Sequence, residues 1–175
     1  MTRHRFDIVC YNTYPSRVNS TPSALQHEIQ QAKPFATAPQ EATLSLGRTW
    51  ALLEHALAEL LKAHGLTPTQ YNVLRILRGS GDEGLCRGEV MDRMITKVPD
   101  ATRLLDRLER AALISRQRGA GDRRFVSTHL TDKGRTALAA LDAPVEAMHH
   151  AHFAALATDE VRTLIDLLAR IRGAM

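Results

Sequence analysis

The hydrophobic pattern of this chain has a helical period over most of its 175 residues and changes to strand alternation after Leu113-Ile114. Beyond that point, a Gly119-Ala120-Gly121-Asp122 turn separates a basic stretch from alternating residues that run from Phe125 to Leu130. Alternation next to a glycine-rich turn is typical of a β-hairpin. The sequence therefore predicts a mainly α fold that carries one small β-hairpin.

Apolar residues at three- and four-residue steps predict helices on both sides of the hairpin. Thr67-Pro68-Thr69-Gln70 has the form of a capping box with proline at the first helical position. Pro99 is expected in the first turn of the helix before the hairpin, and a bend is expected at Pro144 in the helix after it. The predicted helices cover 24–32, 41–64, 67–78, 87–95, 99–112, 131–156 and 158–172.

Positive charge is concentrated in the middle of the chain. The formal net charge is +4, yet the stretch 85–135 alone holds twelve Lys or Arg against seven Asp or Glu. Four arginines around the predicted turn are expected to repel one another unless an anionic partner receives them, which favours nucleic acid. These arginines are Arg116, Arg118, Arg123 and Arg124, and the acid among them is Asp122.

Cysteine content and chemical motifs exclude several classes of protein. Cys10 and Cys86 are too few for a disulfide framework. We find no signal-peptide core and no transmembrane stretch, so we expect a reduced, cytoplasmic setting without a membrane partner. The sequence also lacks a glycine-rich phosphate loop, a paired-cysteine metal motif and a nucleophile elbow. We therefore expect neither an enzyme nor a bound cofactor.

Three short helices followed by a hairpin are the element order of a winged helix-turn-helix, whose third helix enters the major groove of DNA. Here that helix is 99–112. Arg103 and Arg107 lie one turn apart on its polar side, where both can reach base edges or phosphates. Taken alone, a charged helix face is more typical of a solvated surface. The basic hairpin beside it favours DNA binding.

Two motifs resemble those of the MarR (multiple antibiotic resistance regulator) family. The stretch 98–109, Val-Pro-Asp-Ala-Thr-Arg-Leu-Leu-Asp-Arg-Leu-Glu, is similar to the recognition helix of that family. Asp122-Arg123-Arg124, followed by Leu130-Thr131 and Gly134, is similar to its wing. With the matching stretch Leu66 to Tyr71 and the last helix, the likeness covers 41–172. Thr128 stands where the family has an aliphatic residue, so we expect a more loosely packed wing.

The resemblance implies a homodimeric regulator of transcription that binds an inverted repeat in double-stranded DNA, a repressor released by a small-molecule effector. Arg124 would enter the minor groove, held extended by Asp122. Pro99, Asp100, Thr102 and Arg103 would face the major groove. The complete expected set of DNA-binding residues is Lys97, Pro99, Asp100, Thr102, Arg103, Arg107, Arg118, Asp122, Arg123 and Arg124.

The long helices carry more apolar surface than the short ones can cover, which also favours a dimer. We expect 67–131 to form the DNA-binding lobe, and 41–66 with 132–175 to form the dimerisation region. Residues 1–40 would be an N-terminal arm, irregular to about residue 22, that joins the dimer interface. The effector would enter the cleft between lobe and dimer helices, near Trp50, His55 and Tyr71.

Three alternatives remain open. Cys86, just before a helix, or Cys10, in the arm, could sense oxidants, although an inert thiol is the simpler interpretation. A metal-responsive regulator is the second: Glu146, His149, His150 and His152 could bind a metal, although a histidine-rich polar surface is simpler. The third is an architectural or protein-interaction module that uses the winged fold without reading sequence.

Overall fold

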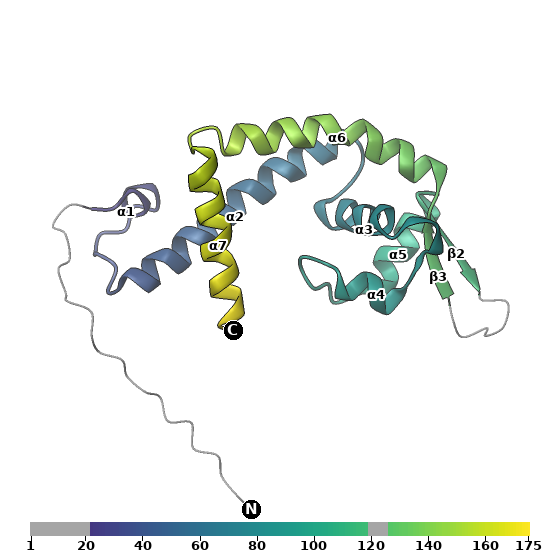
Figure 1. Ribbon diagram of the computed structural model, residues 1–175, viewed down its shortest axis with the longest axis horizontal. Helices are drawn as coiled ribbons and strands as arrows, with labels where there is room; N and C mark the ends of the chain where they lie inside the picture. The colour runs from purple at the N-terminus through teal and green to yellow at the C-terminus, as the bar shows by residue number, and fades with distance from the viewer. Residues whose placement is uncertain (1–21, 119–125) are drawn as a thin grey trace, which may run out of the picture. The chain divides into compact units, whose positions relative to one another are not determined.

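The computed structural model describes residues 22–118 and 126–175, which form helices and one small sheet (Figure 1). It divides into two units inside α2, one reaching to Thr49 and the other beginning at Trp50. The helices are α1 (Ala24–Glu28), α2 (Ala38–Lys62), α3 (Pro68–Gly79), α4 (Arg87–Asp92), α5 (Ala101–Arg110), α6 (Asp132–His152) and α7 (Thr158–Gly173), with a 3₁₀ helix η1 at Gly81–Glu83. The strands are β1 (Leu85–Cys86), β2 (Ile114–Arg118) and β3 (Val126–Leu130).

In the N-terminal unit, α1 is shorter than the sequence predicts. Ser23 and Gln26 form a capping box at its start. Gln30 has a φ of 53°, and a left-handed residue cannot continue a right-handed helix. The predicted helix 24–32 is therefore wrong beyond Glu28.

In the second unit, α3, α4 and α5 follow one another as the predicted three short helices. The Thr67 hydroxyl accepts a hydrogen bond from the Gln70 N–H at 3.2 Å, and the Gln70 side chain accepts one from the Thr67 N–H at 2.9 Å. This is the predicted capping box. α4 ends at Asp92 rather than Ile95, because the Ile95 N–H donates to the Asn72 side chain of α3 at 3.1 Å.

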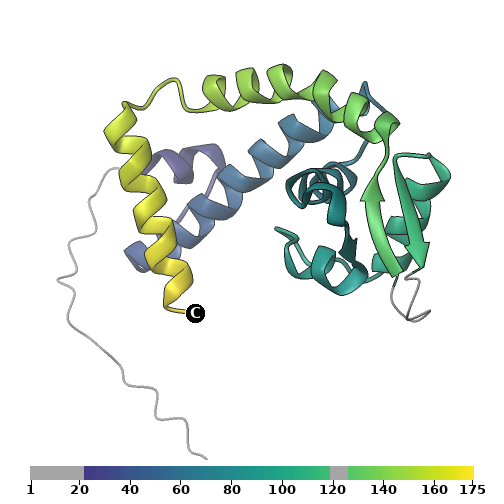
Figure 2. The same cartoon turned by 45° about the vertical axis from the view of Figure 1, so that its right-hand side comes forward.

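The sheet is antiparallel with the strand order β1-β3-β2. β2 and β3 pair from Ile114 opposite Leu130 to Arg118 opposite Val126, and Figure 2 shows them side by side as the predicted hairpin. β1 adds a third strand that the sequence did not indicate, because two residues are too few to show alternation. Thr128 lies on the central strand and is only 1% exposed, so this threonine packs inside the fold.

The last two helices follow the sheet directly. The Thr131 hydroxyl accepts a hydrogen bond from the Gly134 N–H at 3.1 Å, which makes Thr131 the predicted N-cap of α6. α6 contains Pro144 and ends at His152, four residues before the predicted end. α7 begins at Thr158 as predicted, but none of its residues is buried within one chain.

A single hydrophobic cluster joins the elements of the second unit. It includes Leu61 of α2, the inward side of α3 and α5, the sheet and the first half of α6. The fully buried large side chains are Leu61, Val73, Leu74, Leu77, Val90, Leu105, Leu108, Ile114, Thr128, Leu138 and Leu141. This core fixes α5 and the hairpin relative to each other.

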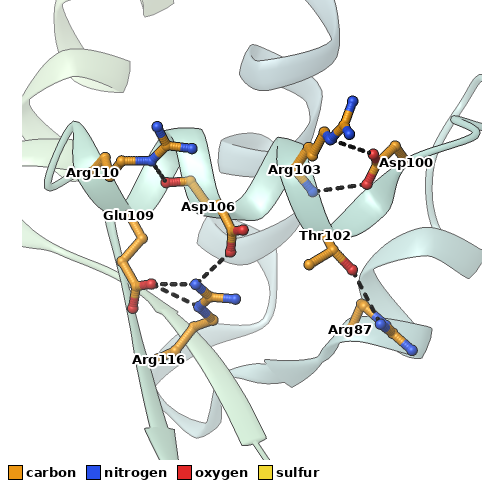
Figure 3. Close-up of polar contacts among 8 residues, drawn as sticks. All are labelled: Arg87, Asp100, Thr102, Arg103, Asp106, Glu109, Arg110 and Arg116. Carbon is orange, nitrogen blue, oxygen red and sulfur yellow. Dashed lines mark hydrogen bonds and ion pairs between the residues drawn. The ribbon is translucent and has the colours of Figure 1, made fainter.

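Arg116 of β2 connects the sheet to α5 (Figure 3). Its Nε lies 2.8 Å from Glu109 Oε2, and its Nη2 bonds Glu109 as well and lies 2.6 Å from Asp106 Oδ1. The two acids share one side of the helix because they are three residues apart. The hydrogen bond from Arg116 lowers the pKa of Glu109, and Glu109 in turn raises the pKa of Arg116. We call Arg116, Asp106 and Glu109 the wing clamp.

We predict that Gly134→Ala destabilises the protein. A Cβ at this buried position would lie 2.2 Å from the Leu113 carbonyl oxygen and 2.7 Å from Leu130 Cδ1. Such overpacking costs about 1–3 kcal/mol, measurable by urea unfolding at fixed protein concentration. The control is Gly47→Ala in α2, where no atom lies within 4 Å of the new Cβ; there alanine should stabilise by about 0.5–1 kcal/mol. Equal effects at both sites would contradict the close packing.

We also predict a pH-dependent cost for Glu109→Gln. Because Arg116 lowers the pKa of Glu109 in the folded protein, the stabilisation is present above the unfolded pKa and is lost as pH falls through the folded one. The carboxylate is 38% exposed, so with solvent screening the cost at pH 7 should be about 0.5–1 kcal/mol. It should shrink as the pH falls below the ordinary glutamate pKa and through the lowered pKa of Glu109 in the folded protein.

Urea unfolding of the wild type and the Glu109→Gln variant across this pH range measures the difference. Glu54→Gln on exposed α2 is the matched control, since Glu54 has no ion-pair partner in the described part of the chain. A cost for Glu109→Gln that stays constant as the pH falls to the acid limit of folding would argue against the charged contact.

Candidate nucleic-acid interface

Asp100 sets the start of α5. Its Oδ1 accepts a hydrogen bond from the Arg103 N–H at 2.9 Å, and its Oδ2 lies 3.1 Å from Arg103 Nε. Aspartate is a preferred N-cap, so the helix begins at Ala101. The prediction that Pro99 lies in the first helical turn is therefore wrong: Pro99 precedes the cap. Both Pro99 and Asp100 are exposed.

Three arginines line one side of α5, at spacings of four and three residues. Arg103, Arg107 and Arg110 are all exposed, and Figure 3 shows Arg103 and Arg110 on the same side of the helix. Arg110 Nε donates to the Asp106 carbonyl at 3.3 Å. Within the residues that the structure describes, Arg107 has no ion-pair partner. We call these three residues the arginine strip.

The wing clamp removes Arg116 from the cationic cluster that the sequence predicts. With two carboxylates on its guanidinium and only 29% of its side chain exposed, Arg116 is not held out toward a partner. The prediction of four free arginines at the hairpin is therefore wrong for this one. Arg118 is exposed at the end of β2. Asp122, Arg123 and Arg124 lie outside the described residues, and their roles stay predictions.

Thr102 and Lys97 each contact α4. The Thr102 hydroxyl accepts a hydrogen bond from Arg87 Nη1 at 3.2 Å, and both side chains are exposed (Figure 3). Lys97 Nζ donates to the Met91 carbonyl at 3.2 Å and lies 3.9 Å from Asp92. Sequence analysis did not single out Arg87, because no short-range pattern relates residues fifteen positions apart.

A cavity of about 860 Å³ lies between α3, α6 and the start of α7. Arg75, Arg162 and His149 give its lining polar groups, and Phe153 and Val161 give it apolar ones. Arg78 and Asp142 also line it, joined by two hydrogen bonds of 2.8 and 2.9 Å that lower the pKa of Asp142.

The expected effector residues do not line this cavity. Trp50 and His55 are exposed on α2, whereas Tyr71 is buried and its hydroxyl accepts a hydrogen bond from Arg75 at 3.0 Å. Sequence reasoning expected a cleft between the lobe and the dimer helices but not these lining residues, because α3 meets α6 and α7 only through packing between segments distant along the chain.

The weaker sequence signals have ordinary surroundings. The Cys86 N–H donates to Glu89 at 2.7 Å, and this bond lowers the pKa of that carboxylate; Cys10 lies outside the described residues. In residues 22–118 and 126–175, no three His, Cys, Asp or Glu side chains are grouped as metal ligands would be. Over the same residues, no helix has the length and apolarity to cross a membrane.

Comparison with known proteins gives the family. The model of the MarR family matches residues 64–124. YkoM of Bacillus subtilis strain 168, an HTH-type transcriptional regulator, is 32% identical over 136 residues, which are 74% of this chain and 86% of the relative. A crystal structure of a MarR transcription factor from Planctomyces limnophilus is 38% identical with a TM-score of 0.61, covering 78% of this chain and 98% of that one.

A structure of the S. aureus MepR-DNA complex shares the fold, with a TM-score of 0.68 at 20% identity over 81% of this chain and 100% of that chain. The three short helices, the hairpin and the long flanking helices agree with these likenesses, as the sequence motifs predict. From the family match and from relatives covered over most of their length, we conclude that this chain belongs to the MarR family of transcription regulators, which are not enzymes.

Proposed function

We propose that the protein is a homodimeric repressor that binds an inverted repeat in double-stranded DNA and is released by a small-molecule effector. One observation carries the proposal: the arginine strip stays exposed on α5 while Arg116 occupies the two acids of the same helix. DNA phosphates attract such an exposed positive surface. Its action on DNA would take place in the cytoplasm.

The arginine strip and the hairpin would contact different parts of the DNA. Arg103 and Arg107 would contact base edges or phosphates in the major groove, together with Thr102. The ion pair of Arg103 with Asp100 does not prevent this, since the Arg103 side chain is 80% exposed and a surface pair is weak. Arg118 and Arg123 would contact phosphates, and Arg124 would enter the minor groove. The structure of MepR in complex with DNA, which shares the fold, supports DNA binding by a protein of this fold.

Unburied apolar residues on the long helices support a homodimer. Ile165, Leu167 and Ile171 are 57%, 46% and 48% exposed on α7, and Trp50 is 49% exposed on α2. Soluble proteins rarely leave so many large apolar side chains exposed on neighbouring turns unless a partner covers them. A two-fold pair would place two α5 helices about one DNA turn apart, which is the spacing of an inverted repeat.

The cavity is our candidate for the effector site. Three arginines against two acids, Asp142 and Glu146, favour a small anionic molecule, and Phe153 and Val161 suit an apolar part of it. Because its walls come from α3 of the lobe and from α6 and α7, a ligand there would favour one arrangement of lobe and dimer helices over another. Operator affinity would fall if the favoured arrangement does not match the DNA spacing. Trp50, His55 and Tyr71 remain an alternative set, proposed from the sequence.

Selection from random duplex DNA, with and without small aromatic or aliphatic acids, tests the proposal. We expect an enriched inverted repeat whose affinity drops when an acid is bound. Binding without any enriched sequence would instead indicate an architectural module. Binding to no duplex at all would remove the DNA-binding function.

Arg103→Ala is expected to weaken binding to the selected repeat by about 1–3 kcal/mol and to relax the preference at one base pair of each half-site. Arg110→Ala removes the same charge from the other end of α5. It should lower affinity on all sequences alike and reduce the salt slope by about one. Fluorescence anisotropy with matched and mismatched duplexes measures both; an equal loss for Arg103→Ala on every sequence would make Arg103 a backbone contact.

Ile165→Asp is expected to convert the dimer to a monomer, because the new carboxylate would be buried in an apolar interface. Sedimentation velocity would report half the mass, and binding to the full repeat should weaken at least ~100-fold since the two half-sites no longer act together. Thr163→Asp, an exposed polar site on the same helix, is the control. A dimer that persists in the Ile165→Asp variant would place the interface elsewhere.

A further inference from the structure

The hydrogen bond between Arg87 and Thr102 joins the two helices of the helix-turn-helix at the surface proposed to face DNA (Figure 3). Arg87 is the first residue of α4, and Thr102 lies in the first turn of α5. Both side chains are exposed, so neither is needed to fill the core. The contact therefore has its consequences at the surface.

The direction of this hydrogen bond fixes what Thr102 can offer a ligand. A threonine hydroxyl has one hydrogen to donate and two lone pairs that accept. A guanidinium only donates, so Arg87 must occupy a lone pair of Thr102 Oγ1. In the described residues Thr102 Oγ1 donates to no protein acceptor, and its hydrogen remains available for a partner.

We propose that Arg87 is a positioning residue that holds the Thr102 hydroxyl as a donor toward DNA, so that Thr102 selects a base edge carrying an acceptor. This inference rests on the proposed DNA-binding function. In the major groove the acceptors are guanine N7 and O6, adenine N7 and thymine O4, whereas cytosine presents a donor. Arg87 leaves Thr102 Oγ1 its hydrogen and one lone pair, whereas without Arg87 both lone pairs are open to donors and the hydroxyl rotates freely, so the preference for an acceptor falls.

The charge of Arg87 favours the same location. Within the described residues, no carboxylate lies within ion-pair distance of its guanidinium, in contrast to Arg78, Arg103 and Arg116. Four of its five N–H donors remain after the bond to Thr102. They can meet a phosphate, which would keep the guanidinium beside Thr102 while the base is read.

The first measurement repeats the selection described above with the wild type and with Thr102→Val, and the difference locates the base pair whose preference Thr102→Val relaxes. On that pair we compare wild type, Arg87→Met and Thr102→Val. In each duplex the contacted base is replaced by an analogue that lacks one acceptor atom. A 7-deazapurine lacks the purine N7, 2-aminopurine lacks the O6 of guanine, and 5-methyl-2-pyrimidinone lacks the O4 of thymine. The wild type should lose roughly three- to tenfold in affinity when the contacted acceptor is removed.

In the Arg87→Met variant this loss should be less than half as large, and the preference for an acceptor-bearing base should fall by a similar roughly three- to tenfold factor. Thr102→Ser keeps the hydroxyl and should behave like the wild type. The double variant Arg87→Met with Thr102→Val should show the same base preference as Thr102→Val alone, because Arg87 acts on that preference through Thr102. Thermal unfolding checks that Arg87→Met leaves the fold intact, as expected for an exposed side chain.

Arg93→Met is the matched control, since Arg93 is exposed at the end of α4 and has no hydrogen bond to α5 among the described residues. It should lower affinity uniformly and keep the base preference. If Arg87→Met also lowers affinity uniformly and keeps the base preference, Arg87 is only a phosphate contact and the inference is overturned. It is overturned as well if Thr102→Val changes no base preference, or if the selected base offers only a donor. A wild type that enriches no repeat would instead reject the proposed function itself.

Discussion

The wing clamp is the interaction on which the proposed DNA-binding surface depends. Asp106 and Glu109 on α5 would otherwise be two unpaired negative charges on the helix that carries the arginine strip. By binding both, Arg116 offsets one of the two negative charges and fastens the acidic side of the helix to β2. One contact therefore sets both the charge that the helix presents and its orientation relative to the hairpin.

Helix starts with a capping signal were predictable from the sequence because that signal is local, whereas α2 begins at Ala38 and not at 41, and α5 at Ala101 and not at Pro99. Thr67 with Gln70, and Thr131 before α6, are capped as their spacing indicates. Helix ends were predicted less well, since α4 stops where Ile95 bonds to Asn72 on another helix. β1 has too few residues to leave a pattern and exists through its pairing with β3. The fold class was predictable, but boundaries set by tertiary contacts were not.

The candidate site likewise has residues that local spacing predicts and residues that only tertiary packing places. Arg103 and Arg107 could be placed on the exposed side of α5 by counting helical turns, and the structure confirms that they are exposed. Arg116 could not be separated from the free arginines, because its partners lie seven and ten residues away on a different element. Arg87 and the cavity between α3, α6 and α7 depend on packing between distant segments, which composition and periodicity do not encode.

Because no residue of α7 is buried in a single chain, the amount of active regulator would depend on the concentration of its subunits. If its apolar face is covered only after two chains meet, the amount of active regulator grows with the square of the subunit concentration when subunits are scarce. Operator occupancy would then rise steeply over a narrow range of expression. A cell could silence the regulator by modest dilution, for example during growth, even without a chemical signal.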